Sequence, residues 1–223
     1  MNISSEIVAL LQELGCLMAA VLTGFVTFRC LSLAYRVLLL SLAISLPVEV
    51  GTRYGWFDGN LAHNINLPAD VGLQLLVALL LLKNGRYKMP FLLAFLACIA
   101  VWLVDIWTRG IIAQFAIHAM LANSVVLAAV YILVLYRIPV HTKLPVYKVP
   151  EFWLCLGGIL FYGCNIPYFG FFDYLNEQYN DLSVFFLDYM IVPLSSVFCL
   201  LIIVSFILMA RQQRVAQPSS SAT

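Results

Sequence analysis

The chain has 223 residues, of which 63% are hydrophobic and 10% are charged, and its mean hydropathy is +0.98. Soluble domains are close to half apolar and a quarter charged, so this composition excludes a soluble globular protein. The formal net charge of +1 comes with no cluster of basic residues of the kind that binds phosphate backbones, which excludes a nucleic-acid partner.

Seven apolar runs follow one another along the chain. A membrane-spanning helix needs about 20 mostly apolar residues. Backbone groups in lipid must be satisfied internally, so runs this continuous predict helices rather than the alternating strands of a barrel. The sequence predicts an all-α polytopic membrane protein, a single seven-helix transmembrane domain over residues 1–210 with a short disordered cytoplasmic tail at 211–223. Its spans are 6–28, 31–51, 67–82, 89–108, 111–136, 151–168 and 184–210.

Three of these runs have features that bear on function. The first has no basic start and contains Glu13, so it is predicted to be a retained helix rather than a signal peptide. The third opens with Pro68, a residue suited to a first helical turn, which places Asp70 beside the positive end of the helix dipole. The sixth is interrupted at Pro167, and the aromatic, acidic segment 169–183 after it is either an interfacial belt or a lid over an outward pocket.

The charged residues sort by side of the membrane. Ten of the twelve Lys and Arg residues lie in alternate connections and in the tail, and the other side has only Arg53 and Arg109. Because cytoplasmic loops are rich in Lys and Arg, the N-terminus is predicted outside and the C-terminus in the cytoplasm. Among the eleven carboxylates only Glu151 falls on the basic side, so the outer half is predicted to be acidic.

Both outer arginines follow a carboxylate by four residues. Glu49 precedes Arg53 at the end of the second span, and Asp105 precedes Arg109 at the end of the fourth. An acid four residues before a base lies on the same helix face. These four residues are therefore predicted to form structural ion pairs.

Three ionisable residues within spans have no such local partner, namely Glu13, His118 and Asp188. Glu13 and His118 each lie about seven residues from the outer edge, or about 10 Å deep. Ionisable groups inside a membrane mark functional sites by default. We therefore predict an acidic, outward-facing cavity for ligand binding or ion coupling; the alternative is interhelical hydrogen bonding that only holds the bundle together. Its members would be Glu13, Asp70, Gln74, His118, Asn123 and Asp188, with Asn165 nearby.

Cofactor chemistry finds little support in these residues. The lysines all lie in predicted cytoplasmic connections, which excludes a retinal Schiff base, and only His118 lies clearly within a span, which argues against a bis-histidine haem. A catalytic zinc ion needs three protein ligands. His118, Glu13 and Asp188 could supply them, with His63 as an alternative or further ligand, but these residues have no recognisable metal-binding spacing. No cofactor is predicted, the metal question stays open, and an intramembrane metal-dependent hydrolase is the third functional candidate.

Proline and glycine positions hint at an internal repeat. Pro47 and Pro167 interrupt the second and sixth spans, and Gly55-Trp-Phe-Asp58 is echoed by Gly170-Phe-Phe-Asp173. Parallel repeats of this kind place a substrate site at their interface. In size, span number and N-out topology the chain resembles the small sugar transporters of the SWEET type.

A second resemblance rests on Glu49, on Asn64 and Asn66 in the predicted loop after it, on Asp70, and on Phe152-Trp153 at the start of the sixth span. In these positions the chain is similar to small seven-span bacterial inner-membrane proteins of unassigned function. The resemblance implies a bacterial cytoplasmic membrane and implies no activity.

The function predicted from these features is recognition of a small solute or cation in the outer cavity, leading to transport. The main rival is a sensor subunit that signals through its basic loops to a separate effector protein; a homo-oligomer fits either role. A transporter needs a polar path that continues inward, whereas 77–82 is wholly apolar and 199–208 is interrupted only by Ser205. That pattern favours the sensor.

Overall fold

The computed structural model describes the backbone of residues 3–112, 114–141, 145–178 and 190–216, and the side chains of 14–112, 114–138, 145–177 and 190–215. Within these ranges the chain forms seven long helices joined by short connections and three single 3₁₀ turns. The helices are α1 Ile3–Thr27, α2 Leu33–Arg53, α3 Gly59–Leu82, α4 Lys88–Arg109, α5 Ile117–His141, α6 Pro150–Gln178 and α8 Val192–Ala216.

Each predicted span contains one of these helices, so the all-α bundle is confirmed. Six of them, α2 to α6 and α8, are long and apolar enough to cross a membrane, and a shorter apolar helical stretch, Leu14–Cys30, runs from α1 through the 3₁₀ turn after it. The number of actual spans and the side that faces the cytoplasm stay predictions. In α8 the helix continues to Ala216, so residues 211–216 are helical where a disordered tail was predicted; residues 217–223 lie outside the described part.

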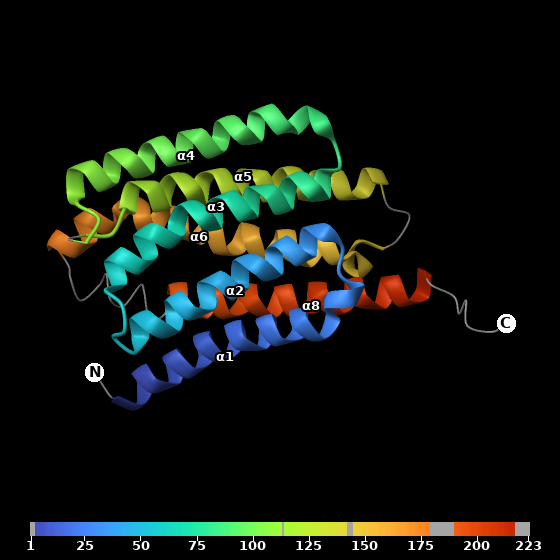
Figure 1. Ribbon diagram of the computed structural model, residues 1–223, viewed down its shortest axis with the longest axis horizontal. Coiled ribbons are helices and arrows are strands. Elements are labelled where there is room, and N and C mark those ends of the chain that lie inside the picture. The colour runs from blue at the N-terminus through green and yellow to red at the C-terminus, as the bar shows by residue number, and fades with distance from the viewer. Residues whose placement is uncertain (1–2, 113, 142–144, 179–189, 217–223) are drawn as a thin grey trace.

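The helices run alternately up and down (Figure 1). One end of the bundle corresponds to the half that was predicted to be acidic, and we call it the acidic end. The helix termini at Arg53, Gly59, Arg109 and Ile117 lie there. The basic end is the opposite one, with Lys83 and Lys88. The largest interhelical contacts join α5 to α6, α6 to α8, α1 to α8 and α2 to α3. The core is apolar and aromatic, and its most fully buried side chains include Tyr35, Leu38, Leu127, Leu154, Ile202 and Phe206.

The fourth helix, α4, lies at the edge of the bundle (Figure 1). Only 17% of its apolar span is buried, against 44% for α5 and for α8. Trp107, 90% exposed, and Leu103 and Val104 point away from the other helices. In a membrane this face of α4 contacts lipid or another chain.

The start of α3 differs from the prediction. The helix begins at Gly59, not near Leu67, because the Asp58 side chain accepts a 3.0 Å hydrogen bond from the Leu61 amide and caps it. Pro68 therefore lies inside the helix. Asp70 lies about halfway along α3, some 17 Å from either end at 1.5 Å per residue, rather than beside the helix dipole.

A proline inside a helix leaves the carbonyl four residues earlier without its usual donor. Here that carbonyl belongs to Asn64, and the indole Nε1 of Trp102 on α4 donates to it at 2.9 Å. A neighbouring helix thus supplies the hydrogen bond that Pro68 cannot, and α3 continues through the proline.

Two other boundaries were also predicted wrongly. The helix α6 continues through Pro167 to Gln178, so residues 169–178 are helical rather than a loop. The helix α5 begins at Ile117, and the described residues between it and α4, 110–112 and 114–116, are not helical. His118 consequently lies in the first turn of α5 and not about seven residues deep in a span.

Candidate functional site

A network of polar side chains lies between α2, α3 and α5 at the middle of the bundle. The Ser41 hydroxyl donates to Asp70 Oδ1 at 2.8 Å, and Gln74 Nε2 lies 3.5 Å from the same oxygen and 3.3 Å from Ser41 Oγ. The Tyr131 hydroxyl donates to Gln74 Oε1 at 2.6 Å. We call Ser41, Asp70, Gln74 and Tyr131 the central network.

Local sequence explains how these groups meet. Asp70 and Gln74 are four residues apart and share one face of α3. Tyr131 reaches them from α5 because its ring lies against Gly158 of α6, where a side chain would collide with the ring carbons. The ring also stacks on Tyr162, with centroids 6.0 Å apart. Ser41, Gln74 and Tyr131 are all buried, so the network is closely packed on several sides.

The polar groups continue from the central network toward the acidic end. His63 precedes Asp70 by seven residues on α3, and Glu49 follows Ser41 by eight on α2, so each lies on the same helix face about two turns further out. His63 Nδ1 is 3.9 Å from Glu49 Oε1. Both helices thus place titratable groups along their common interface.

A second polar group joins α4, α5 and α6 at the acidic end. Asp105 Oδ1 lies 3.2 Å from Arg109 Nε and 3.0 Å from His118 Nδ1, and Asp105 Oδ2 accepts a 3.1 Å hydrogen bond from the Ala119 amide. The two terminal nitrogens of Arg109 then bind both oxygens of Asp173, at 3.2 and 2.6 Å. We call Asp105, Arg109, His118 and Asp173 the acidic-end cluster.

These contacts confirm the predicted Asp105–Arg109 pair and enlarge it. The Asp105 carboxylate is almost completely buried, with 1% of its side chain exposed, whereas that of Asp173 is half exposed. The other predicted pair, Glu49 with Arg53, stays a prediction: the charge of Arg53 acts on Glu49, and the ring of His63 lies beside the same carboxylate.

The structure brings only some of the predicted site residues together. Asp70 and Gln74 meet in the central network, but His118 belongs to the acidic-end cluster, and its expected lack of a partner is wrong because α4 places Asp105 beside it. Asn123 is buried on α5, and its Oδ1 has no hydrogen-bond partner among the described residues. Glu13 lies on α1 with its side chain outside the described part, and Asp188 lies outside it altogether.

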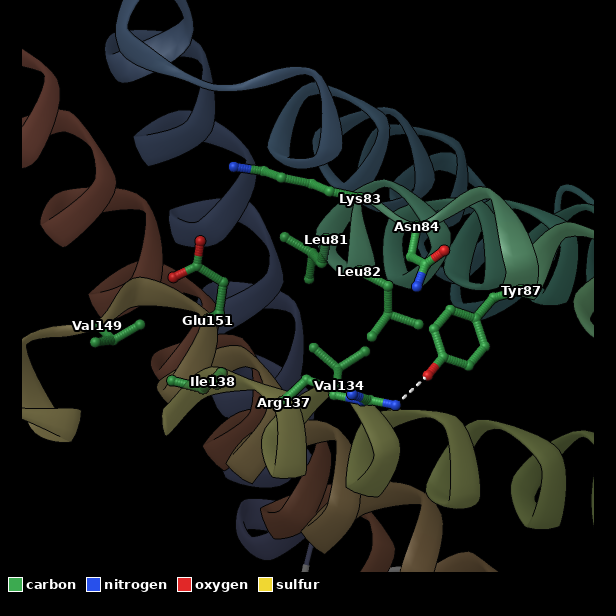
Figure 2. A pocket seen from close by; sticks show the side chains of 10 residues that line it. All are labelled: Leu81, Leu82, Lys83, Asn84, Tyr87, Val134, Arg137, Ile138, Val149 and Glu151. Carbon is green, nitrogen blue, oxygen red and sulfur yellow. Dashed lines mark hydrogen bonds between the residues drawn. The ribbon is translucent and has the colours of Figure 1, made fainter. Parts of the chain in front are cut away.

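A cavity opens at the opposite end from the predicted outward pocket. It has a volume of about 530 Å³ at the basic end of the bundle, between the ends of α3 and α5 and the start of α6 (Figure 2). Its polar and charged lining is Lys83, Asn84, Tyr87, Arg137 and Glu151, and its apolar walls are Leu81, Leu82, Val134, Ile138 and Val149.

Within the described residues, no three His, Cys, Asp or Glu side chains are grouped as metal ligands. Glu13 and Asp188, half of the candidate zinc set, lie outside the described side chains. His63, expected in a loop, is part of α3, and His141 is the last residue of α5.

Comparison with known proteins returns no match: no protein-family model, no curated protein and no solved structure matches this chain. Function is therefore inferred from the geometry of the chain's own residues.

Sequence reasoning missed three contributors to these sites, namely Ser41, Tyr131 and Asp173. For Ser41 a signal existed, since Ser41, Ser45 and Glu49 recur every four residues in an otherwise apolar run. The early start of α3 also had a signal in the capping residue Asp58. Nothing local to Tyr131 or Asp173 indicates which helix lies opposite.

Proposed function

We propose that this chain is a multi-pass membrane protein that transports a cation, with Asp70 as the membrane-embedded coupling carboxylate. The cation is a proton, a small metal ion or a small organic cation. The observation that carries the proposal is the carboxylate of Asp70 halfway along α3. Among the described residues it is held by hydroxyl and amide donors and by no positive charge. A carboxylate with a purely structural role inside a membrane is expected to pair with a basic side chain. The Asp70 carboxylate is therefore available to bind a transported cation.

The partners of Asp70 suit that role. Ser41 and Gln74 orient the carboxylate, and Tyr131 fixes the amide of Gln74 in turn. Hydroxyl and amide groups can donate to the charged carboxylate, and their oxygens can help coordinate a cation that arrives there. The central network can therefore hold Asp70 in place whether or not the cation is present.

The position of the cavity supports a path through the bundle. Val134 and Ile138, which line the cavity, follow Tyr131 by three and seven residues on α5, and Leu81 follows Gln74 by seven on α3. The cavity thus begins about one to two turns from the central network. On the other side, Glu49 and His63 continue the polar line toward the acidic end. The sensor was favoured because the inner half of the chain is apolar. This cavity shortens the apolar distance that a transported ion would have to cross.

The experiment is a flux assay on the purified full-length chain in sealed proteoliposomes. Proton, sodium and potassium gradients are imposed in turn, and uptake is followed with a pH-sensitive or ion-sensitive dye. We expect a gradient-driven flux in the wild type that falls at least about tenfold in Asp70→Asn. Glu177→Gln, which neutralises an exposed carboxylate at the end of α6, is the matched control and should retain the flux.

Two results would count against transport. Flux that is unchanged in Asp70→Asn, when both variants elute as folded monodisperse protein, removes Asp70 from the path. No flux for any of the three ions in the wild type, combined with an Asp70-dependent rise in Tm on adding one of them, would favour the sensor.

The sensor has one specific observation in its support. Ser205, the single polar residue in the apolar run of α8, donates to the Pro150 carbonyl at 2.7 Å and lies 3.0 Å from the Tyr35 hydroxyl. It therefore joins α8, α6 and α2 rather than extending a polar path, and such a contact would pass a shift between helices.

A further inference from the structure

The cavity at the basic end has a chemical character that cation transport does not explain. Its charged lining comprises two bases, Lys83 and Arg137, and one acid, Glu151. They come from three different segments: Lys83 follows the end of α3 with φ +50°, Arg137 lies in the last turns of α5, and Glu151 lies in the first turn of α6. The fold therefore brings both signs of charge to one hollow.

Most of the hydrogen-bonding capacity of these residues is unused. Arg137 donates one 2.7 Å hydrogen bond to the Tyr87 hydroxyl and lies over the same ring, which leaves most of its five N–H donors available. Within the described residues, neither Lys83 nor Glu151 forms an ion pair within 4.0 Å. Among the described residues, the cavity therefore presents charges of both signs that have no ion-pair partner.

Arg137 and Glu151 lie on different sides of the hollow. In Figure 2 the guanidinium of Arg137 points to Tyr87 on one side, and the carboxylate of Glu151 lies on the other side with the ammonium of Lys83 above it. A ligand that satisfies both ends carries an anionic group for Arg137 and a hydrogen-donating cation for Glu151. It is a zwitterion.

The place of the cavity in the bundle narrows the ligand further. The polar residues lie at the ends of α3 and α5, the level at which lipid phosphates lie in a bilayer. Leu82, Val134 and Ile138 line the cavity within a turn of them and give it an apolar wall. Arginine binds phosphate through two parallel N–H groups, and a polar rim above an apolar wall suits a headgroup that is joined to an acyl chain. About 530 Å³ is within the range of small-ligand sites.

We propose that this cavity is a binding site for an ammonium-bearing phosphate, with the phosphate on Arg137 and the ammonium on Glu151. The same chemistry is offered by phosphatidylethanolamine in the surrounding leaflet and by a soluble aminoalkyl phosphate. The apolar wall favours the lipid. The site shares no residue with the central network, so this proposal and cation transport can fail separately.

The test measures Tm of the delipidated full-length protein in detergent against three probes: phosphatidylethanolamine, phosphatidylglycerol, which has the phosphate without the amine, and glycerophosphoethanolamine, which has the headgroup without acyl chains. A ligand that binds the folded state raises Tm by mass action. We expect a saturable rise with phosphatidylethanolamine, a half-maximal concentration about tenfold higher for phosphatidylglycerol, and a much weaker response to the soluble headgroup. A response to the soluble headgroup at the same concentration assigns the site to a solute instead of a lipid.

Variants separate the site from general lipid effects. Arg137→Gln should weaken the binding of both lipids by about tenfold, which is the affinity expected from one charge-assisted hydrogen bond. Glu151→Gln should abolish the preference for phosphatidylethanolamine over phosphatidylglycerol while leaving phosphate binding intact. Arg86→Gln is the matched control, since Arg86 is exposed at the same end and does not line the cavity.

The proposal is overturned if Arg86→Gln weakens lipid binding as much as Arg137→Gln, or if none of the three probes raises Tm. It is also overturned if Glu151→Gln keeps the wild-type preference. This last result decides the question even if Arg137→Gln does not fold.

Discussion

The indole Nε1 of Trp102 donates a 2.9 Å hydrogen bond to the backbone carbonyl of Asn64, the group that Pro68 leaves without a helical donor. Trp102→Phe keeps the aromatic bulk and removes that donor. Because an unsatisfied buried carbonyl costs about 1–3 kcal/mol, we expect a lower Tm in thermal unfolding. Trp107→Phe, five residues along the same helix and 90% exposed, should leave Tm unchanged.

Pro68→Ala provides the decisive control for that contact. Alanine restores an amide four residues after Asn64, so the carbonyl regains a helical donor when the indole is absent. The double variant Pro68→Ala/Trp102→Phe should therefore lose less stability than Trp102→Phe alone. An equal loss in the single and double variants would show that the indole contributes by packing.

Asn64 also holds the connection between α4 and α5. Its Nδ2 donates to the carbonyls of Ile111 and Gln114, both at 2.9 Å, and its Oδ1 accepts from the Ala116 amide at 3.0 Å. Asn64→Ala removes all three bonds, so we expect faster tryptic cleavage after Arg109. Asn66→Ala is the control, because the structure gives this partly exposed side chain no such role. Equal cleavage rates in both variants would contradict the prediction.

Gly158 and Gly163 form a matched pair within α6. A Cβ on Gly158 would lie 2.6 to 2.9 Å from the ring carbons of Tyr131, whereas a Cβ on Gly163 meets nothing within 4 Å. Gly158→Ala should displace the ring, break its bond to Gln74 and cost about 1–3 kcal/mol. Gly163→Ala should be neutral or stabilising by up to about 1 kcal/mol, because alanine favours helices. Thermal unfolding of both variants checks the sign, and a stabilised Gly158→Ala would be inconsistent with the packing described.

The two carboxylates that contact Arg109 should behave differently. Asp105 is buried and contacts Arg109, His118 and the Ala119 amide, so Asp105→Asn disturbs a buried hydrogen-bond acceptor and should cost about 1–3 kcal/mol. Asp173 is half exposed, so Asp173→Asn should cost about 1 kcal/mol or less, and this loss should shrink as salt is raised. Tm measured at low and high salt tests both expectations; the reverse ranking would mean that the exposed pair is the stronger one.

The fold class follows from the sequence because span length and hydrophobicity are local properties, and each predicted span does contain a helix. Pro68 and Pro167 led to wrong predicted boundaries for α3 and α6. A proline was treated as a helix start or break, but both helices continue through it. For Pro68 the missing donor is replaced by Trp102, which lies 34 residues further along the chain.

The sites follow the same division. Asp105 and Arg109 could be paired from the sequence because a spacing of four fixes their common helix face. The contacts of Asp70 with Ser41, of Gln74 with Tyr131 and of Arg109 with Asp173 could not, because they depend on which helices are neighbours and how each is rotated. One cavity had been expected, whereas the structure has two separate polar groups, the central network and the acidic-end cluster. The depth of a residue along its helix does not indicate which neighbouring helix its side chain faces.

The helix α4 combines the shallowest burial of the six apolar helices with polar contacts close to one end. Apolar surface gives little orientation to a helix in lipid, because lipid tails solvate it as well as another helix does. The indole of Trp102, the carboxylate of Asp105 and the guanidinium of Arg109 can each be satisfied in one rotational setting of α4. The azimuth of this outermost helix is therefore determined by hydrogen bonds and charge rather than by shape, and a variant that loses them would keep α4 in the membrane but let it turn.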